Sequence, residues 1–306
     1  MKYAIFGSTG FIGQHLVSYL RDRGEDVLEI SRSGKSDSIP VDITNKEEFT
    51  KIKFSPDIII NCASRTPVKG KTSQDPDFLK EIFLTNIIGA INIANWAINV
   101  KAKKLINCST LAVVNKPWPD PLLENHVDIP NGYHVGYSMS KLSQEQILNE
   151  ALKDTSVELI HARLSAIYGL GMVEEGLIYS LLGNLIQDKD VVLFDAHKNT
   201  LDLLHVRDVS EILFHLSQSK DRHNVVNVAR GKQISVFILA EVLKKLSKSS
   251  SRLVDKETSN LPSKSNVSTL LLKEVLRNKK RDFISIQDGL EEIVQHFLDK
   301  KELDFN

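Results

Sequence analysis

The sequence has few cysteines, no long apolar run and no net charge, and each absence argues against a class of protein. Two cysteines in 306 residues are too few to staple a small disulfide-rich domain. Cys62 and Cys108 both end apolar runs, so we expect two reduced core thiols. No apolar run approaches the length of a membrane span. With 39 basic and 39 acidic residues, nothing favours nucleic acid or an anionic membrane as a partner.

Signals for metal binding and for export are also missing. The nine histidines show no ligand spacing such as HExxH, so we expect no metal site. The chain begins with a strand-like segment instead of a basic stretch followed by an apolar one, which argues against a signal peptide. Together with the reduced thiols, this predicts a cytoplasmic protein.

A glycine-rich turn follows the first expected strand. Residues 7–13 read Gly-Ser-Thr-Gly-Phe-Ile-Gly and lead into a helical stretch at 15–20. Glycines allow a sharp turn and the close approach of a pyrophosphate, and the helix N-terminus supplies free N–H groups. The pattern also occurs in ordinary strand-to-helix turns, but its position after the first strand favours a dinucleotide. The residues expected to contact this cofactor are Gly7, Thr9, Gly10, Phe11, Ile12 and Gly13.

Strand-like and helix-like segments alternate through the first two-thirds of the chain. The strand signal is carried by residues 3–6, 26–30, 58–61, 104–108 and 158–163. This βαβα alternation predicts an α/β fold: a Rossmann-like, doubly wound parallel sheet with helices on both faces. In such a sheet the ligand binds at the carboxyl ends of the strands.

The alternation ends near residue 170, where a smaller α+β part is expected. Helices are predicted at 176–187, 209–217, 236–246 and 287–298, and short strands at 190–194 and 224–229. We expect an NAD(P)-binding domain over 1–168, with 205–230 returning to it, and an interleaved C-terminal substrate domain over 169–306. The Ser- and Lys-rich residues 246–266 are expected to form a solvated loop.

A tyrosine and a lysine four residues apart begin a predicted helix. Tyr137 and Lys141 share one helix face, and a nearby ammonium would lower the pKa of the phenol. Tyr137 would then exchange a proton near neutral pH. Thr110, at the end of the strand 104–108, can hydrogen-bond a substrate oxygen beside it, and Ser109 is the competing hydroxyl.

These motifs together resemble the extended short-chain dehydrogenase/reductases, a group of nucleotide-sugar epimerases, dehydratases and 4-ketoreductases. The matching segments are 7–13, 42–43, 61–64, 86–90, 108–114, 137–141, 163–169, 201–209 and 288–290. The resemblance implies Thr110, Tyr137 and Lys141 as the catalytic residues. It also implies cofactor contacts from Asp42, Ile43, Cys62, Ala63, Ser64, Tyr137, Lys141 and Leu164. The implied substrate contacts are Arg65, Thr66, Thr110, Ser165 and Ala166, and residues 65–77 and 115–136 are expected to line the pocket.

Four positions depart from the family pattern. Ala166 stands where sugar-nucleotide enzymes often place an Asn that contacts substrate phosphates. Leu201 stands where many place a phosphate-binding Arg. Residues 111–112, Leu-Ala, replace the acidic pair of the 4,6-dehydratases, so water elimination is not expected.

The end of the second strand indicates the cofactor. An Asp that binds both ribose hydroxyls is typical of NAD enzymes, but this chain has Ser31 followed by Arg32. Arg32 can pair with a 2′-phosphate and Ser31 can donate to it, so NADP is favoured, with NAD possible. Net reductases usually draw on NADPH. We therefore expect a reductase of a nucleotide-linked keto-sugar. A sugar-nucleotide epimerase, a reductase of another ketone and a catalytically silent NADP-binding regulator remain alternatives.

The predicted helix at 78–100 is apolar on nearly every side. A helix on a sheet needs one apolar stripe, so a second stripe needs another partner, either later parts of the chain or a second subunit. Members of the resembled family often pair this helix and the Tyr137 helix with their mates. We therefore expect a homodimer.

Overall fold

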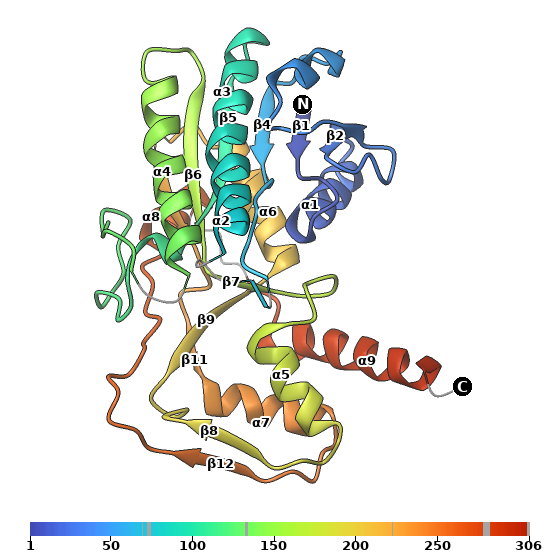
Figure 1. Ribbon diagram of the computed structural model, residues 1–306, viewed down its shortest axis with the longest axis vertical. Coiled ribbons are helices and arrows are strands. Elements are labelled where there is room, and N and C mark those ends of the chain that lie inside the picture. The colour runs from blue at the N-terminus through green and yellow to red at the C-terminus, as the bar shows by residue number, and fades with distance from the viewer. Residues whose placement is uncertain (69, 72–74, 132–133, 222, 278–281, 305–306) are drawn as a thin grey trace.

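The computed structural model describes residues 1–306 except 69, 72–74, 132–133, 222, 278–281 and 305–306. Its larger part is built on a parallel sheet of seven strands in the order β10-β6-β5-β4-β1-β2-β3 (Figure 1). The strands are β1 (Lys2–Phe6), β2 (Asp26–Ser31), β3 (Ile39–Pro40), β4 (Ile58–Asn61), β5 (Lys104–Thr110), β6 (Glu158–Leu164) and β10 (Val225–Val228). The order reverses between β1 and β4. The predicted α/β fold is therefore confirmed.

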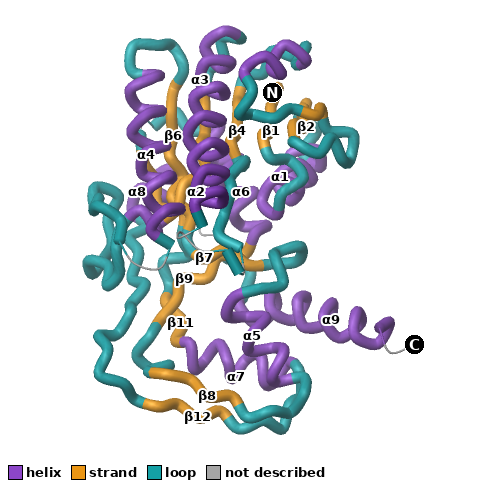
Figure 2. The backbone as a smooth tube through the Cα atoms, in the orientation of Figure 1, coloured by secondary structure: helices purple, strands orange, loops and turns teal. Residues whose placement is uncertain are grey.

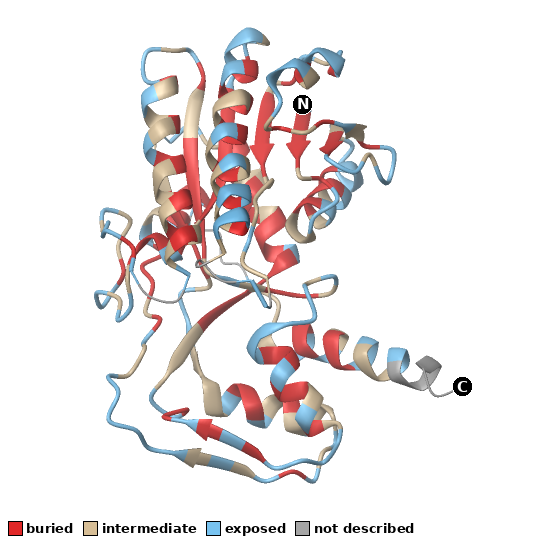
Figure 3. Ribbon diagram, viewed as in Figure 1, coloured by how far each residue is buried: buried red, intermediate tan, exposed pale blue. Residues whose placement is uncertain are grey.

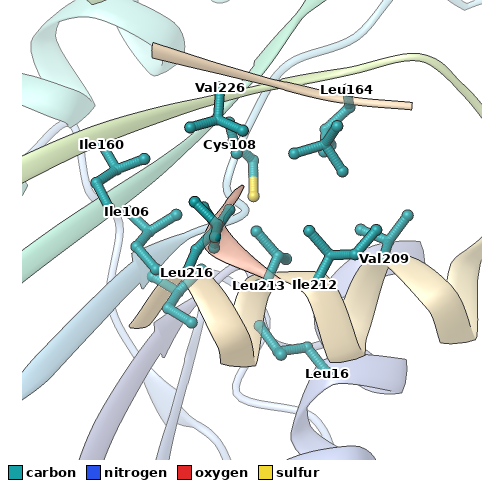
Figure 4. Packing of buried hydrophobic residues seen from close by; sticks show 14 of the residues in the cluster. Leu16, Ile106, Cys108, Ile160, Leu164, Val209, Ile212, Leu213, Leu216 and Val226 are labelled. Atoms are coloured by element: carbon teal, nitrogen blue, oxygen red, sulfur yellow. The ribbon is translucent and has the colours of Figure 1, made fainter. Parts of the chain in front are cut away.

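Helices cover both faces of this sheet. On one face α1 (Phe11–Asp22) packs beside α6 (Val206–Gln218), and α8 (Leu270–Val275) lies against β10. Figure 4 shows Leu16 of α1 and Leu213 of α6 in one apolar cluster with Ile106 and Ile160 of the sheet. Each such buried side chain contributes about 1.5–3 kcal/mol of transfer free energy. On the other face α3 (Gly89–Asn99) packs beside α4 (Val135–Leu152).

A continuous helical segment runs from Pro76 to Asn99. It consists of α2 (Pro76–Phe83), the π-helical segment η2 (Leu84–Ile88) and α3. This segment agrees with the helix predicted at 78–100. Asp75 caps its start by accepting hydrogen bonds from the N–H groups of residues 77 and 78. By length and composition alone its 24 residues could cross a membrane. In this fold, buried apolar residues of α3 such as Ile93 and Trp96 pack in the core beside the sheet.

The smaller part lies beyond the carboxyl edge of the large sheet (Figure 2). One sheet joins β7 (Ala166–Tyr168), β9 (Thr200–His205) and β11 (Gln233–Ser235), and another joins β8 (Val191–Phe194) and β12 (Leu253–Lys256). Three helices pack with them: α5 (Gly176–Leu185), α7 (Val236–Leu246) and α9 (Ile286–Asp304). Between these elements the chain returns to the larger part to form α6 and β10.

The expectation of a loop over residues 246–266 is wrong in its middle. Residues 253–256 form β12, which pairs in parallel with β8. Leu253 packs against the core of the smaller part, whereas Val254 points outward and is 39% exposed. The Ser-rich flanks hid this short strand, because only its pairing with β8 supplies the hydrogen bonds that make it one.

The strands beneath the site are almost fully buried (Figure 3). All four residues of β4 and the first six of β5 are buried. Their registers align Asn61 with Phe6 of β1 and Thr110 with Leu164 of β6. The carboxyl ends of four neighbouring strands therefore meet at one edge, and the expected site residues follow them.

Candidate functional site

The glycine turn is close-packed against the neighbouring strand end. Gly7 has a φ of +75°, and a Cβ there would lie 2.7 Å from the backbone nitrogen of Ala63. A Cβ on Gly13 would lie 2.1 Å from the carbonyl oxygen of Gly7. A Cβ on Gly10 would meet one neighbouring atom, the Gly7 oxygen, at 3.2 Å. Two glycines thus fix the turn, while the third leaves its outer side open.

The N-terminus of α1 is arranged to accept an anion. Gly10 is its N-cap and offers no side-chain hydrogen bond, so the first-turn N–H groups are not capped by a side chain. Phe11 and Ile12 of that first turn are half-buried, and Thr9 is exposed. Free N–H groups and the helix dipole favour a phosphate here. The glycine-lined approach and uncapped helix end therefore fit the pyrophosphate of a dinucleotide.

The end of β2 turns sharply through a network of serines. The Ser31 hydroxyl accepts a hydrogen bond from Gly34 N at 3.1 Å and lies 2.7 Å from the Ser38 hydroxyl. Since Ser38 donates its own hydrogen to Lys35 O, Ser31 is left to donate to Ser38. Ser31 is buried and Arg32 is exposed. Ser31 therefore shapes the turn and has no hydrogen left for a ligand, whereas Arg32 is accessible.

The next segment of the expected cofactor site packs onto α3. Ile43 lies against the first residue of that helix, where a Cβ on Gly89 would come within 2.5 Å of the Ile43 Cδ1. The Asp42 carboxylate accepts hydrogen bonds from the backbone and hydroxyl of Thr44 at 2.9 and 2.8 Å. These contacts fix the loop that follows β3.

Tyr137 lies in the first turn of α4, with its phenol between two hydroxyls. It hydrogen-bonds with the side chains of Thr110, the last residue of β5, and Ser64, which follows β4. Thr110 also accepts a hydrogen bond from Ala112 N at 3.1 Å, so its hydrogen is free to go to the phenol. Ser64 donates to Asn86 Oδ1 at 3.1 Å. Three elements thus converge on one oxygen.

The competing hydroxyl, Ser109, belongs to a different network. It donates to the Glu145 carboxylate, which forms a buried ion pair with Arg163 at 2.7 Å. Arg163 also donates to the carbonyl oxygens of Glu124 and His126. Ser109 is therefore used in holding α4 to β6, and Thr110 is the hydroxyl beside Tyr137.

The structure contradicts the expectation that Lys141 lowers the pKa of Tyr137. Burial raises the pKa of Tyr137 to about 12, and the hydroxyls of Thr110 and Ser64 offset this only in part. Burial also lowers the pKa of Lys141 to about 8. The Lys141 ammonium donates to Cys108 O at 2.7 Å and to Gln144 Oε1. Spacing along α4 places both residues on one face, but the ammonium is held by these two acceptors.

Asn86 is a further functional candidate, which belongs to the matching segment 86–90 but has no role predicted from the sequence. It is fully buried in η2, and its side-chain oxygen accepts hydrogen bonds from the Ser64 hydroxyl and Arg65 N. Its amide nitrogen donates to Ser140 Oγ at 2.9 Å and to Arg65 O at 3.1 Å. Asn86 therefore ties the strand end that carries Ser64 to the helix that carries Tyr137.

The two cysteines are free thiols at the ends of β4 and β5. Their sulfur atoms lie 3.6 Å apart, and Figure 4 shows Cys108 among the apolar side chains over α6. Hydrogen bonding to Cys108 and burial raise the pKa of Cys62. Cys62 and Ala63 line the glycine turn with their backbone. Leu164, the last residue of β6, is buried beside Thr110 in the strand register.

The expected substrate contacts surround this edge. Arg65 is half-buried, pairs with Glu81 at 2.9 Å and lies over the Phe78 ring. Thr66 and Ala166 are exposed, and Ser165 is half-buried beside Asp202. Positions 69, 72–74, 132 and 133 of the expected pocket lining fall outside the described residues. Within the described residues, no group of three or more His, Cys, Asp or Glu could hold a metal ion.

Comparisons with known proteins agree with this architecture. The family model of the NAD dependent epimerase/dehydratase family matches residues 3–229. The chain is 25% identical over 254 residues to a putative UDP-glucose 4-epimerase of Methanocaldococcus jannaschii, covering 78% of this chain and 80% of that protein. It is 24% identical over 250 residues to the GDP-6-deoxy-D-talose 4-dehydrogenase of Aggregatibacter actinomycetemcomitans, covering 81% and 80%.

Among solved structures, a UDP-N-acetylglucosamine 4-epimerase from Methanobrevibacter ruminantium M1, in complex with UDP-N-acetylmuramic acid, shares the fold. It gives a TM-score of 0.82 at 20% identity over 98% of each chain. The match to the family model spans most of the sheet, the glycine turn and the Tyr137 helix. The chain belongs to the NAD dependent epimerase/dehydratase family, the extended short-chain dehydrogenase/reductases that its motifs resemble.

Proposed function

We propose that this protein is an NADP(H)-dependent reductase of a nucleotide-linked keto-sugar, of the 4-ketoreductase type. The observation that carries the proposal is the end of β2, where a basic turn replaces a carboxylate. Ser31 is buried inside the turn, and Arg32 and Lys35 are exposed on it. A carboxylate at this position would repel a 2′-phosphate, whereas exposed cations attract one. Arg32 rather than Ser31 is therefore the proposed phosphate contact.

The cofactor lies, in this proposal, on the larger part, residues 1–168 with 205–230, and the sugar reaches it from residues 169–306. NADPH, when bound, supplies the hydride. Thr110 and Tyr137 face the carbonyl oxygen of the substrate. As the carbonyl carbon is reduced, Tyr137 gives its proton to that oxygen, and Thr110 donates a hydrogen bond to it.

Tyr137 holds the proton that the proposed reduction needs. With a pKa near 12, the phenol carries its proton throughout the neutral range and can act as an acid at once. The two free cysteines suit a reducing compartment, so we place the reaction in the cytoplasm.

An NAD(P)-dependent nucleotide-sugar epimerase is the second candidate, because the family description names NAD and the archaeal relative is a putative epimerase. The dehydrogenase among the relatives shows that the family also includes enzymes named for net oxidoreduction. A silent NADP-binding regulator is disfavoured because the Thr110–Tyr137 hydrogen bond and the buried lysine are intact.

The test is a stoichiometric assay. Purified protein is mixed with NADPH or NADH and a set of nucleotide-linked 4-keto-sugars, and cofactor absorbance and sugar product are followed together. The proposal predicts one NADPH oxidised for each sugar reduced. Sugar interconversion without net cofactor oxidation would establish the epimerase, and NADPH binding without conversion of any sugar would favour the regulator.

A further inference from the structure

We propose that Gln144 is a positioning residue for Lys141, holding its ammonium between β5 and the π-helical segment η2 without adding a charge. The inference rests on the proposed function for its consequence in catalysis, because Lys141 is one of the residues expected to contact the cofactor. The positioning itself is a property of the cofactor-free protein and can be measured in it.

The geometry gives Gln144 one unambiguous orientation. Its Oε1 accepts a hydrogen bond from Lys141, and its Nε2 donates to the backbone oxygen of Asn86. The reverse orientation would place an NH₂ group against an ammonium and an oxygen against a carbonyl, and neither pair contains an acceptor and a donor. Gln144 therefore bridges the Lys141 ammonium to η2.

Burial makes this bridge hard to replace. Lys141 and Gln144 are both 1% exposed, and Asn86 is fully buried. Lys141 has three N–H donors, of which Cys108 O and Gln144 Oε1 take two. The third remains for a ligand at the carboxyl edge. Two fixed acceptors on two elements thus leave the ammonium little freedom except in the direction of that donor.

Gln144 adds no charge to the surroundings of the Lys141 ammonium. The other titratable groups that face Lys141 are Cys62 and Cys108 from the strand ends and Glu145 from its own helix. Glu145 is already bound to Arg163 and Ser109, and His161 of β6 lies near the same carboxylate. An amide accepts the ammonium's hydrogen bond without the charge that would stabilise it further. Burial lowers the pKa of Lys141 to about 8, and the nearby Cys108, Glu145 and Cys62 offset this only in part.

The test compares Gln144→Glu and Gln144→Met with the same two substitutions at Gln146. Gln146 is exposed on the same helix and serves as a matched control. Two readouts are taken: the pKa of Lys141 in cofactor-free protein, from NMR of the labelled lysine side chains assigned with Lys141→Arg, and the dissociation constant of NADPH between pH 6 and 10.

Gln144→Glu keeps the acceptor for Lys141 and adds a charge, although it loses the donor to Asn86 O. The added charge should raise the Lys141 pKa by about one to three units. Gln144→Met removes a hydrogen bond to the charged form, so it should lower the pKa and weaken NADPH binding about tenfold. The Gln146 variants should change neither quantity. Gln144→Glu, which is almost isosteric, carries the test if Gln144→Met fails to fold.

A folded Gln144→Glu protein with an unchanged Lys141 pKa would overturn the proposal, as would a Gln144→Met protein with unchanged NADPH affinity. A role in helix packing alone predicts lower melting temperatures without either change. If no sugar is reduced by the parent protein, the proposed function fails, but the Lys141 titration still decides the role of Gln144.

Discussion

The glycine turn and the Tyr137 site lie at the same edge of the sheet, but they are built in different ways. The turn is made of backbone: Gly7 and Gly13 bring chain segments to distances that no side chain permits. The Tyr137 site is made of side chains from β4, β5, η2 and α4 that hydrogen-bond one another. A backbone cradle fixes where an anion binds, whereas a side-chain network sets protonation. Binding and chemistry should therefore be separable by mutation.

The largest effect of a single substitution is expected at the Tyr137 site. Tyr137→Phe should reduce turnover about 10²- to 10⁴-fold, because the ring remains and the proton donor is lost. The NADPH dissociation constant should change little, since Lys141 keeps its acceptors Cys108 O and Gln144. Steady-state kinetics with a reducible sugar, together with fluorescence titration of NADPH, measures both. Lys141→Ala should damage both quantities.

In the glycine turn, Gly13→Ala should weaken NADPH binding by about 3 kcal/mol, or roughly 150-fold. The added Cβ would lie 2.1 Å from the Gly7 oxygen, so the turn must open. Gly183→Ala in α5 is the control, because a Cβ there meets no atom within 4 Å and replaces a helical glycine. Titration of both variants with NADPH decides the point, and equal affinities would mean that the turn does not hold the cofactor.

A smaller effect is expected for cofactor choice. Arg32→Ala should cost about 1.5–3 kcal/mol of NADPH binding free energy and leave NADH binding nearly unchanged. Lys46→Ala, which removes an exposed cation from the short 3₁₀ helix Lys46–Lys51 after β3, is the control. Thermal-shift titrations with both dinucleotides provide the comparison. If the parent protein binds NADPH and NADH equally well, the proposed preference is wrong.

The smallest effect on chemistry should come from assembly. We propose a homodimer through the segment Pro76–Asn99 and α4, since Leu84, Ile88 and Ile98 leave 36–40% of their surface exposed on the former. Such an interface would brace the Tyr137 helix from behind. Light scattering should give twice the chain mass of 34.4 kDa. A single-chain mass across the micromolar range would rule the dimer out, and Ile88→Glu should favour that state.

The sequence predicted the glycine turn well, because the residues that indicate such a turn are neighbours in the sequence. A strand, three spaced glycines and a helix start are contiguous, and their steric role follows from residue type. The five predicted strands lie where the structure places them, apart from one or two residues at their ends. The Ser31 turn was only half predicted, because the chemistry of a serine does not reveal which neighbour already uses its hydrogen.

The residues of the Tyr137 site were predicted from the sequence, but their pKa values were not. The spacing of Tyr137 and Lys141 showed a shared face, but not that α4 buries Gln144 and Glu145 on it. The pKa values of Tyr137 and Lys141 depend on burial under segments that are distant in sequence. The role of Asn86 likewise depends on contacts with Ser64 and Ser140, which are 22 and 54 residues away.

The central claim is that the glycine turn holds the cofactor and the Tyr137 site performs the chemistry. Its most direct test is to measure turnover and NADPH affinity together in Tyr137→Phe and Gly13→Ala. The account predicts opposite patterns: Tyr137→Phe loses turnover and keeps the cofactor, whereas Gly13→Ala loses cofactor affinity and regains turnover at saturating NADPH. Near-normal reduction by Tyr137→Phe, or loss of NADPH binding in that variant, would contradict the account.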